Sequence, residues 1–275
     1  MISPDNKFLR KDKLPTLWCA GCGNGILMGA IMRAMEACDF AVENTVVVTG
    51  IGCWGKADDY FSTHAFHGTH GRAIPIATGI KFARPSLNVV AMVGDGDGAT
   101  IGGNHLIHAA RRNTDITVIM SNNFNYGMTG GQYSGSTPRD SITSTSPYGH
   151  VEDEFNISAL VKESGAGYVA RETVAKQKQL EKYIKNAFDR GEGFRFIEAL
   201  STCPTQYGKN NKLGDVSERL NDLAENRVDI DNIKELDSEQ LQNEFVVGEY
   251  ADEKVESYLQ RYEKLQQELS PERSE

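Results

Sequence analysis

The 275-residue sequence has few cysteines, no long apolar run and no signal-like beginning. Its five cysteines are an odd number, and residues 1–13 are polar and charged. A secreted disulfide framework is therefore not expected, and metal or redox chemistry is favoured for the cysteines. No stretch approaches the ~20 consecutive apolar residues of a membrane-spanning helix. We expect a cytoplasmic protein with no membrane association.

The sequence also lacks an excess of basic residues. Its net charge is −9, and no basic segment is interleaved with aromatic residues, so a nucleic-acid partner is not expected. The charge is unevenly spread, because residues 215–275 hold 18 acidic and 7 basic residues. Residues 1–214 hold 20 acidic and 22 basic residues, and this nearly neutral part suits an anionic ligand.

What is present is a regular alternation of strand-like and helix-like stretches through residue 200. This alternation predicts an α/β fold with a doubly wound parallel sheet. The strands are expected at residues 45–49, 88–93, 116–121, near 168 and at 194–200, and the helices at 25–37, 73–83, 102–112, 157–164 and 174–189.

The C-terminal part has a different pattern. We divide the chain into a ligand-binding domain, residues 1–208, and an acidic, mainly helical extension, residues 209–275. Residues 213–248 show short helical signals, and residues 250–269 have the apolar spacing of an amphipathic helix. In the first domain, residues 126–148 are rich in Gly, Ser and Thr and too long for a passive connection, which indicates a functional loop.

Unusual residues follow the ends of four expected strands. Ligands of parallel sheets bind at the carboxyl ends of the strands, so these residues predict one site at one edge of the sheet. They are Gly52-Cys53, Gly94-Asp95-Gly96, Asn122-Asn123 and Thr202-Cys203-Pro204.

Asp95 and Asn123 lie 28 positions apart, each at the end of a strand. Mg²⁺ prefers a few oxygen ligands from the protein and leaves the others to substrate phosphates. The Asp95 carboxylate, the Asn123 amide and the backbone carbonyl of Asn125 would supply such a half-shell. Glycines at 94 and 96 would let the backbone approach a diphosphate. The alternative is that both motifs are ordinary turns.

This pairing resembles the diphosphate-binding motif of thiamine diphosphate enzymes. Over residues 16–208, the sequence closely resembles the β subunits of the 2-oxoacid:ferredoxin oxidoreductases, whereas the C-terminal part does not. The resemblance implies a sheet of the thiamine diphosphate-binding type. It is carried by the stretches CAGCGNG, GIGCWGK, HGTHGRAIPIATGIKFARP, GDGDGATIGGNHLIHAARRN, NNFNYGMTGGQYSGSTP and STCPT.

The resemblance implies that four cysteines hold one [4Fe–4S] cluster: Cys19, Cys22, Cys53 and Cys203. A CxxC pair with two distant cysteines is chemically sound, since cluster ligands need only converge in space. A structural zinc site is the competing interpretation of four cysteines. Cys38 is left over and is expected to be a small buried residue.

The resemblance also implies contacts with the organic cofactors. Lys56 matches a position associated with coenzyme A, although an exposed lysine is also common. His64 and His67 are expected to be structural or to form part of the access wall. The expected thiamine diphosphate contacts are Ile51, Gly52, Cys53, Trp54, His70, Gly96, Asp97, Gly127 and Met128.

The implied reaction is the reversible, coenzyme A-dependent oxidative decarboxylation of a 2-oxoacid, with electrons passed through the cluster to ferredoxin. We expect 2-oxoglutarate as the substrate and succinyl-CoA and CO₂ as the products, or the reverse carboxylation of a reductive tricarboxylic acid cycle. No catalytic residue is assigned in this chain. The activating glutamate and the pyrimidine-binding domain are expected on an α subunit, in a heterodimer or a dimer of heterodimers.

Three alternatives stay open. The enzyme could prefer pyruvate or accept many 2-oxoacids, because no arginine is clearly placed for a distal carboxylate; Arg72 is the nearest candidate. It could be a thiamine diphosphate decarboxylase or synthase, although those reactions transfer no net electrons. It could also be a non-catalytic iron–sulfur module, against which Asp95, Asn123 and His70 argue.

Overall fold

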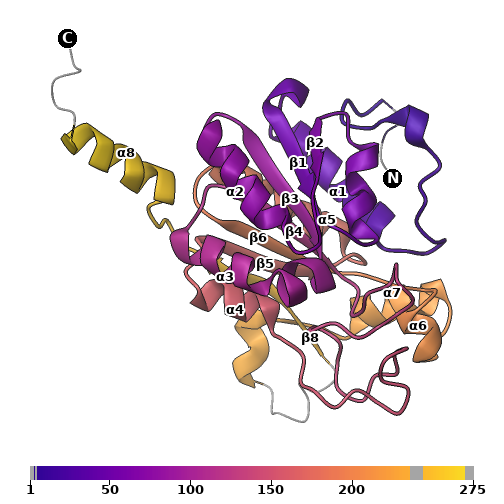
Figure 1. Cartoon of the computed structure of the whole chain (residues 1–275). Helices are drawn as coiled ribbons and strands as arrows, with labels where there is room; N and C mark the ends of the chain where they lie inside the picture. The colour runs from indigo at the N-terminus through magenta and orange to yellow at the C-terminus, as the bar shows by residue number, and fades with distance from the viewer. Residues whose placement is uncertain (1–2, 4, 236–243, 270–275) are drawn as a thin grey trace.

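The computed structural model describes residues 3, 5–235 and 244–269. Its centre is a mostly parallel sheet with the strand order β2-β1-β3-β4-β6-β5-β8-β7 (Figure 1). The predicted doubly wound α/β fold is confirmed. The strands are β1 (Thr45–Thr49), β2 (His64–His67), β3 (Asn88–Gly94), β4 (Thr117–Asn122), β5 (Tyr168–Thr173), β6 (Arg195–Leu200), β7 (Arg227–Asp229) and β8 (Phe245–Asp252).

Helices cover both faces of the sheet. Helices α2, α3 and α4 lie on one face, and α1 and α5 pack together on the other (Figure 1). The helices are α1 (Asn24–Ala37), α2 (Ala73–Ala83), α3 (Gly103–Arg112), α4 (Ile157–Glu163), α5 (Gln177–Arg190), α6 (Tyr207–Asn210), α7 (Val216–Glu225) and α8 (Tyr258–Leu269). Short 3₁₀ segments are Lys11–Lys13, Val42–Asn44, Trp54–Tyr60 and Ile230–Glu235, and Gly96–Ile101 is one turn of π-helix.

The two faces of the sheet bury separate apolar cores. Successive residues of a strand point to opposite faces, so Val47 packs with α1 and α5 while Val48 packs with α2 and α3. Every residue of β1 and β4 is buried, as expected for parallel strands covered on both sides. This burial fixes the carboxyl ends of β1, β3 and β4 close together at one edge of the sheet.

The helix predicted over residues 250–269 is wrong in its first part. Tyr250 and Ala251 are buried in β8, which pairs antiparallel with β5, and the helix α8 begins only at Tyr258. The edge of β5 supplies hydrogen bonds and an apolar surface, which override the helical spacing of this segment. The predicted division of the chain at residue 208 stays a prediction, and residues 236–243 lie outside the described residues.

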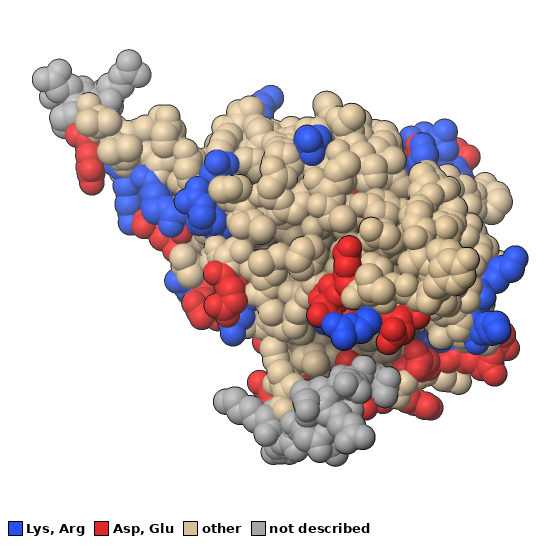
Figure 2. All heavy atoms as spheres, turned by 60° about the horizontal axis from the view of Figure 1, so that its bottom comes forward, with Lys and Arg blue, Asp and Glu red and all other residues tan. Residues whose placement is uncertain are grey.

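The C-terminal part also carries exposed charge and a projecting helix. Helix α8 extends away from the body (Figure 1), and Tyr258 at its start stacks on Phe82 with ring centroids 4.9 Å apart. On the face shown in Figure 2, acidic and basic side chains are interspersed along the lower part. Among the described helices, none is long and apolar enough to cross a membrane.

Candidate active site

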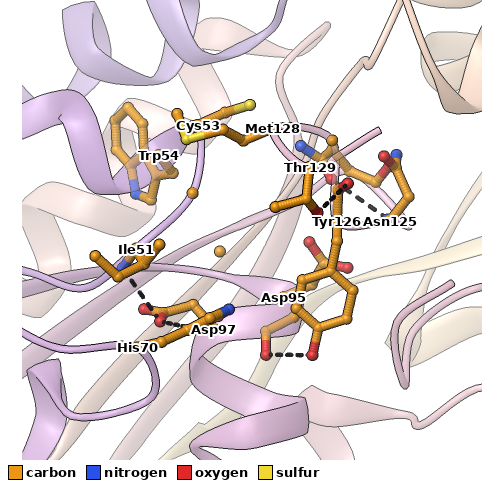
Figure 3. Close-up of a pocket in the computed structure, with 15 residues that line it drawn as sticks. Ile51, Cys53, Trp54, His70, Asp95, Asp97, Asn125, Tyr126, Met128 and Thr129 are labelled. Atoms are coloured by element: carbon orange, nitrogen blue, oxygen red, sulfur yellow. Dashed lines mark hydrogen bonds and ion pairs between the residues drawn. The ribbon is translucent and has the colours of Figure 1, made fainter. Parts of the chain in front are cut away.

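A pocket opens at the carboxyl ends of the central strands (Figure 3). Its cavity volume is about 90 Å³, so the folded chain alone leaves a narrow pocket here. All nine residues expected to contact thiamine diphosphate line it, together with the three expected to hold Mg²⁺. The lining residues are Ile51, Gly52, Cys53, Trp54, His70, Gly94, Asp95, Gly96, Asp97, Asn123, Asn125, Tyr126, Gly127, Met128 and Thr129.

Asp95, directly after β3, forms the floor of the pocket and is 2% exposed. Its Oδ2 accepts hydrogen bonds from Ser134 Oγ at 2.5 Å and Ser136 Oγ at 2.7 Å. Burial raises the pKa of Asp95, and the serine hydrogen bonds oppose that shift. A buried carboxylate is costly without a counter-charge, so this environment fits a bound cation.

The side-chain amide of Asn123 joins the same floor. The terminal amide atom that faces the floor lies 3.3 Å from Asp95 Oδ1 and 2.8 Å from the backbone oxygen of Asn125. Its two neighbours are acceptors, so the amide nitrogen fits this position and donates to both; a bound cation would require the amide to turn its oxygen there.

The three predicted Mg²⁺ ligands are one carboxylate, one side-chain amide and one backbone carbonyl. Among the described residues, no three His, Cys, Asp or Glu side chains are arranged around a single ion. A half-shell with one carboxylate does not need such a group, because phosphates and waters complete the coordination of Mg²⁺. The three predicted Mg²⁺ ligands are therefore adjacent and chemically suited to this role.

Asp97 organises the wall of the pocket on the other side of Gly96. Its Oδ1 accepts hydrogen bonds from the backbone N–H groups of Gly71 at 2.7 Å and Ile51 at 3.3 Å, and lies 2.6 Å from His70 Nδ1. Its Oδ2 is buried without a hydrogen-bond partner among the described residues. These contacts join the loops after β1 and before α2, so Asp97 positions His70 at the pocket.

Gly96 is required by a close approach. A Cβ atom at this position would lie 2.4 Å from a ring carbon of Tyr126, whose hydroxyl donates to the Gly96 carbonyl at 3.0 Å. Only glycine lets the ring pack directly on the backbone there. Tyr126 and Thr129 also line the pocket; both belong to the loop predicted to be functional, but neither was singled out as a contact.

Four cysteines gather at the mouth of the pocket. The Sγ atoms of Cys203 and Cys53 would lie 3.5 and 3.6 Å from a Cβ atom at Gly127, so both thiols flank this residue. Cys19 is exposed, with its Sγ 3.4 Å from Thr205 Oγ1.

The thiols at the mouth influence one another. Burial raises the pKa of Cys22 to about 12 and that of Cys53 to about 11, and the nearby thiols raise both pKa values slightly further. Free thiolates here would be unstable, whereas bonds to metal stabilise them. Four such cysteines fit the donor set of a [4Fe–4S] cluster, in which each cysteine binds a different iron. Cys38 lies elsewhere, at the end of α1, with its Sγ facing the Lys185 carbonyl.

Other predicted residues lie outside the pocket lining. Lys56 is half-buried, with its Nζ 3.9 Å from Asp59 Oδ2. His64 and His67 belong to the exposed strand β2, and His67 Nδ1 lies 2.9 Å from Thr49 Oγ1.

Sequence reasoning missed the residues behind the pocket floor. Ser134 and Ser136 bond Asp95, and Asn122 lies next to Ser136. The Gly/Ser/Thr-rich loop of residues 126–148 was predicted to be functional, but no spacing singled out these two hydroxyls.

The fold and the pocket define a thiamine pyrophosphate enzyme: the family described as "Thiamine pyrophosphate enzyme, C-terminal TPP binding domain" matches residues 45–199. The chain is 46% identical over 250 residues to "2-oxoglutarate synthase subunit KorB" of Methanothermobacter marburgensis, covering 91% of this chain and 87% of that one. It belongs to the β subunits of the 2-oxoacid:ferredoxin oxidoreductases, and is thus one subunit of an oxidoreductase.

Two further relatives extend this similarity across the chain. The subunit of the same name from Methanocaldococcus jannaschii is 42% identical over 271 residues, covering 98% of this chain and all of that one. The solved "2-oxoglutarate:ferredoxin oxidoreductase from Magnetococcus marinus with 2-oxoglutarate, coenzyme A and succinyl-CoA bound" superposes with a TM-score of 0.80 at 28% identity. The superposition covers 98% of this chain and 91% of that one, including the C-terminal part.

Proposed function

We propose that this chain is the β subunit of an enzyme that oxidatively decarboxylates 2-oxoglutarate to succinyl-CoA and CO₂, reversibly and with coenzyme A. The two electrons released pass one at a time through a [4Fe–4S] cluster to ferredoxin. One observation carries the proposal: Asp95 and Cys53 line the same pocket, and the Sγ of Cys203 lies beside Gly127 of that lining. Thiamine diphosphate supplies the electron sink that decarboxylation of a 2-oxoacid needs.

Asp95, Asn123 and the carbonyl of Asn125 would hold Mg²⁺ and, through it, the cofactor diphosphate. The Gly96 backbone leaves room for that diphosphate, and Asp97 holds His70 at the wall beside it. These residues bind and orient the cofactor. No glutamate is given a catalytic role among the described residues of the pocket. We therefore propose that the α subunit supplies the activating glutamate.

The four cysteines would hold the cluster close to the cofactor. Cys53 lines the pocket itself, and Cys203 lies beside the same face of Gly127, so transfer between the two centres would cover a short distance. Cys19 is exposed, so a cluster bound through it would have one side near the surface, where we propose that ferredoxin docks. Lys56 is proposed to contact coenzyme A. The assembly is proposed to be a heterodimer or a dimer of heterodimers.

The substrate assignment rests on the relatives. The two archaeal relatives are named 2-oxoglutarate synthase subunits, and the solved structure holds 2-oxoglutarate. Pyruvate is the alternative, since the contact with the distal carboxylate would come from the α subunit. The ratio of kcat/KM for the two substrates decides between them.

The test uses the chain assembled with its α subunit under anaerobic conditions. We expect bound thiamine diphosphate by mass spectrometry, four irons per chain, and coenzyme A-dependent ferredoxin reduction that the β chain alone does not support. Absence of thiamine would overturn the cofactor assignment, and absence of iron would favour a decarboxylase or synthase. A strong preference for pyruvate would overturn only the substrate.

A further inference from the structure

The two oxygens of Asp95 have separate partners. Oδ2 accepts hydrogen bonds from Ser134 and Ser136, which belong to the loop between β4 and α4. Oδ1 faces the amide of Asn123 and is the oxygen on the side of the pocket floor. The loop hydroxyls therefore hold Oδ2, while Oδ1 lies beside the Asn123 amide, which also lines the pocket.

Ser136 also connects Asp95 to a second asparagine. Its Oγ lies 3.0 Å from Asn122 Oδ1, and Asn122 Nδ2 donates to Glu198 Oε1 at 2.8 Å. Ser136 has a single hydroxyl hydrogen and faces two acceptors, Asp95 Oδ2 and Asn122 Oδ1. The orientation of the Asn122 amide therefore affects how this hydrogen is shared between them. Two groups set that orientation: the Glu198 carboxylate, which accepts only from the nitrogen end of the amide, and the Phe124 backbone N–H, which donates to the oxygen end at 3.2 Å.

Glu198 is a carboxylate in the middle of β6 with no exposed surface. Its Oε2 accepts a hydrogen bond from Ser158 Oγ at 2.6 Å. Arg171, its cross-strand neighbour in β5, is the nearest positive charge, but its Nε lies 3.6 Å away, beyond hydrogen-bond distance. Burying a carboxylate is costly unless it is paired, so the Asn122 and Ser158 hydrogen bonds and the facing Arg171 are what stabilise Glu198 here.

We infer that Glu198, Asn122 and Ser136 form a hydrogen-bonded connection that positions the Asp95 carboxylate for its cation. The inference rests on the proposed Mg²⁺ site. It gives the two consecutive asparagines at the end of β4 different tasks: Asn123 faces the cation, and Asn122 turns away to join Glu198 to Ser136. All the connecting side chains are at most 3% exposed, although Asn122 and Ser136 also line a second pocket beside Arg171.

The alternative is that Glu198 only links β5 to β6 through Arg171. The two roles predict different effects on metal binding. Groups that orient a metal ligand typically change metal affinity about 10–100-fold when removed. A structural pair would change the stability of the sheet and leave the affinity of the folded protein unaltered.

The experiment measures Mn²⁺ binding, by the electron paramagnetic resonance of free and bound Mn²⁺, in the assembled enzyme with thiamine diphosphate. We expect Ser136→Ala to raise the Kd for Mn²⁺ about 10-fold or more. The matched control is Ser141→Ala, which removes another buried hydroxyl of the same loop that bonds Tyr207 instead of Asp95. The control should bind Mn²⁺ as the unaltered enzyme does.

Glu198→Gln keeps the size of the side chain but removes its charge, and should raise the Kd severalfold. Because Glu198 acts through Ser136, the double variant should bind no more weakly than Ser136→Ala alone. Independent, additive losses would overturn the connection, as would unaltered affinity in Ser136→Ala even if Glu198→Gln fails to fold. If the unaltered enzyme binds thiamine diphosphate but no Mn²⁺, the proposed cation site itself is overturned.

Discussion

The floor and the mouth of the pocket are built in opposite ways. At the floor, Asp95 is held by two hydroxyls within 2.7 Å, which leaves one oxygen facing the pocket. At the mouth, the cysteines are free thiols, and their contacts within the described residues are long, such as 3.9 Å from Cys203 Sγ to Asn125 Oδ1.

This difference shows which of the two sites is formed by folding alone, without a bound metal. The floor is oriented by the chain before any cation binds, so a cation adds to an existing arrangement. The mouth holds its thiols near one another, with the pKa of Cys22 and Cys53 raised by burial, and their long contacts do not fix them. We expect the cluster to order its own ligands, while the floor needs no such help.

The largest expected effect comes from removing a thiol. Cys203→Ala should lose the brown chromophore and the reduction of ferredoxin, because three cysteines cannot hold all four irons. Thiamine diphosphate should stay bound, since the floor is separate. Iron and thiamine content, measured in the same sample, check this, with Cys38→Ala as the control that keeps its iron. A full complement of iron in Cys203→Ala would contradict the ligand assignment.

The reciprocal experiment removes the carboxylate of the floor. Asp95→Ala should lose retention of thiamine diphosphate while keeping its iron. The reason is that Asp95, held by Ser134 and Ser136, is the carboxylate of the proposed Mg²⁺ site. Mass spectrometry of the gel-filtered enzyme measures the loss. Asp153→Ala, an exposed aspartate paired with Arg139, is the control. Normal cofactor occupancy in Asp95→Ala would refute the Mg²⁺ assignment.

Gly127 lies between the two sites, so a methyl group there should affect both partially. The added Cβ would lie 3.3 Å from Asn125 Oδ1, a tight contact, and 3.5 and 3.6 Å from the two sulfurs, which is ordinary packing. We expect severalfold weaker thiamine diphosphate binding and a smaller loss of iron. Gly103→Ala is the control, since its Cβ would meet no described atom within 4 Å. Loss of iron with unaltered thiamine diphosphate binding would contradict this prediction, because it would show that residue 127 contacts only the mouth.

The smallest expected effect is on the pH dependence of stability. Because burial raises the pKa of Asp95, the folded chain without cation holds this proton more tightly than the unfolded chain. The free energy of unfolding therefore falls as pH rises from the ordinary aspartate pKa to the raised one, by about 1.4 kcal/mol for each pH unit between them. Asp95→Asn should remove this pH-dependent contribution to the free energy of unfolding. Bound Mg²⁺ with thiamine diphosphate should offset the loss of stability. Thermal unfolding across pH measures both; identical profiles for the two proteins would contradict the prediction.

The sequence predicted the parts of the site that follow strand ends. Strand, turn and glycine signals located Asp95, Asn123 and Cys53, because their positions are set by short-range structure. The serines behind Asp95 lie 39 and 41 positions away, at the far side of a long loop. No local rule gives the distance from such a loop to a strand end, so only the folded structure revealed Ser134, Ser136 and the role of Asn122.

The same reason explains the misplaced C-terminal helix. The spacing of apolar residues after Tyr250 fits a helix, and α8 does form from Tyr258 onward. The preceding residues instead extend β8 along β5, with Val247 fully buried and Tyr250 nearly so. Pairing with a strand far away in sequence outweighs a local preference, and periodicity carries no information about that strand.

The position of β8 has a consequence for the order in which the chain is made. Strand β5 ends at Thr173, and the strand that covers its outer edge begins only at Phe245. At a ribosomal rate of about 5–20 residues per second, the roughly 70 residues between them take about 4–14 seconds to synthesise. During that interval β5 presents an open edge, the kind of surface that other nascent chains can pair with. Fast synthesis of this segment, or a chaperone that shields the edge, would therefore raise the yield of folded protein.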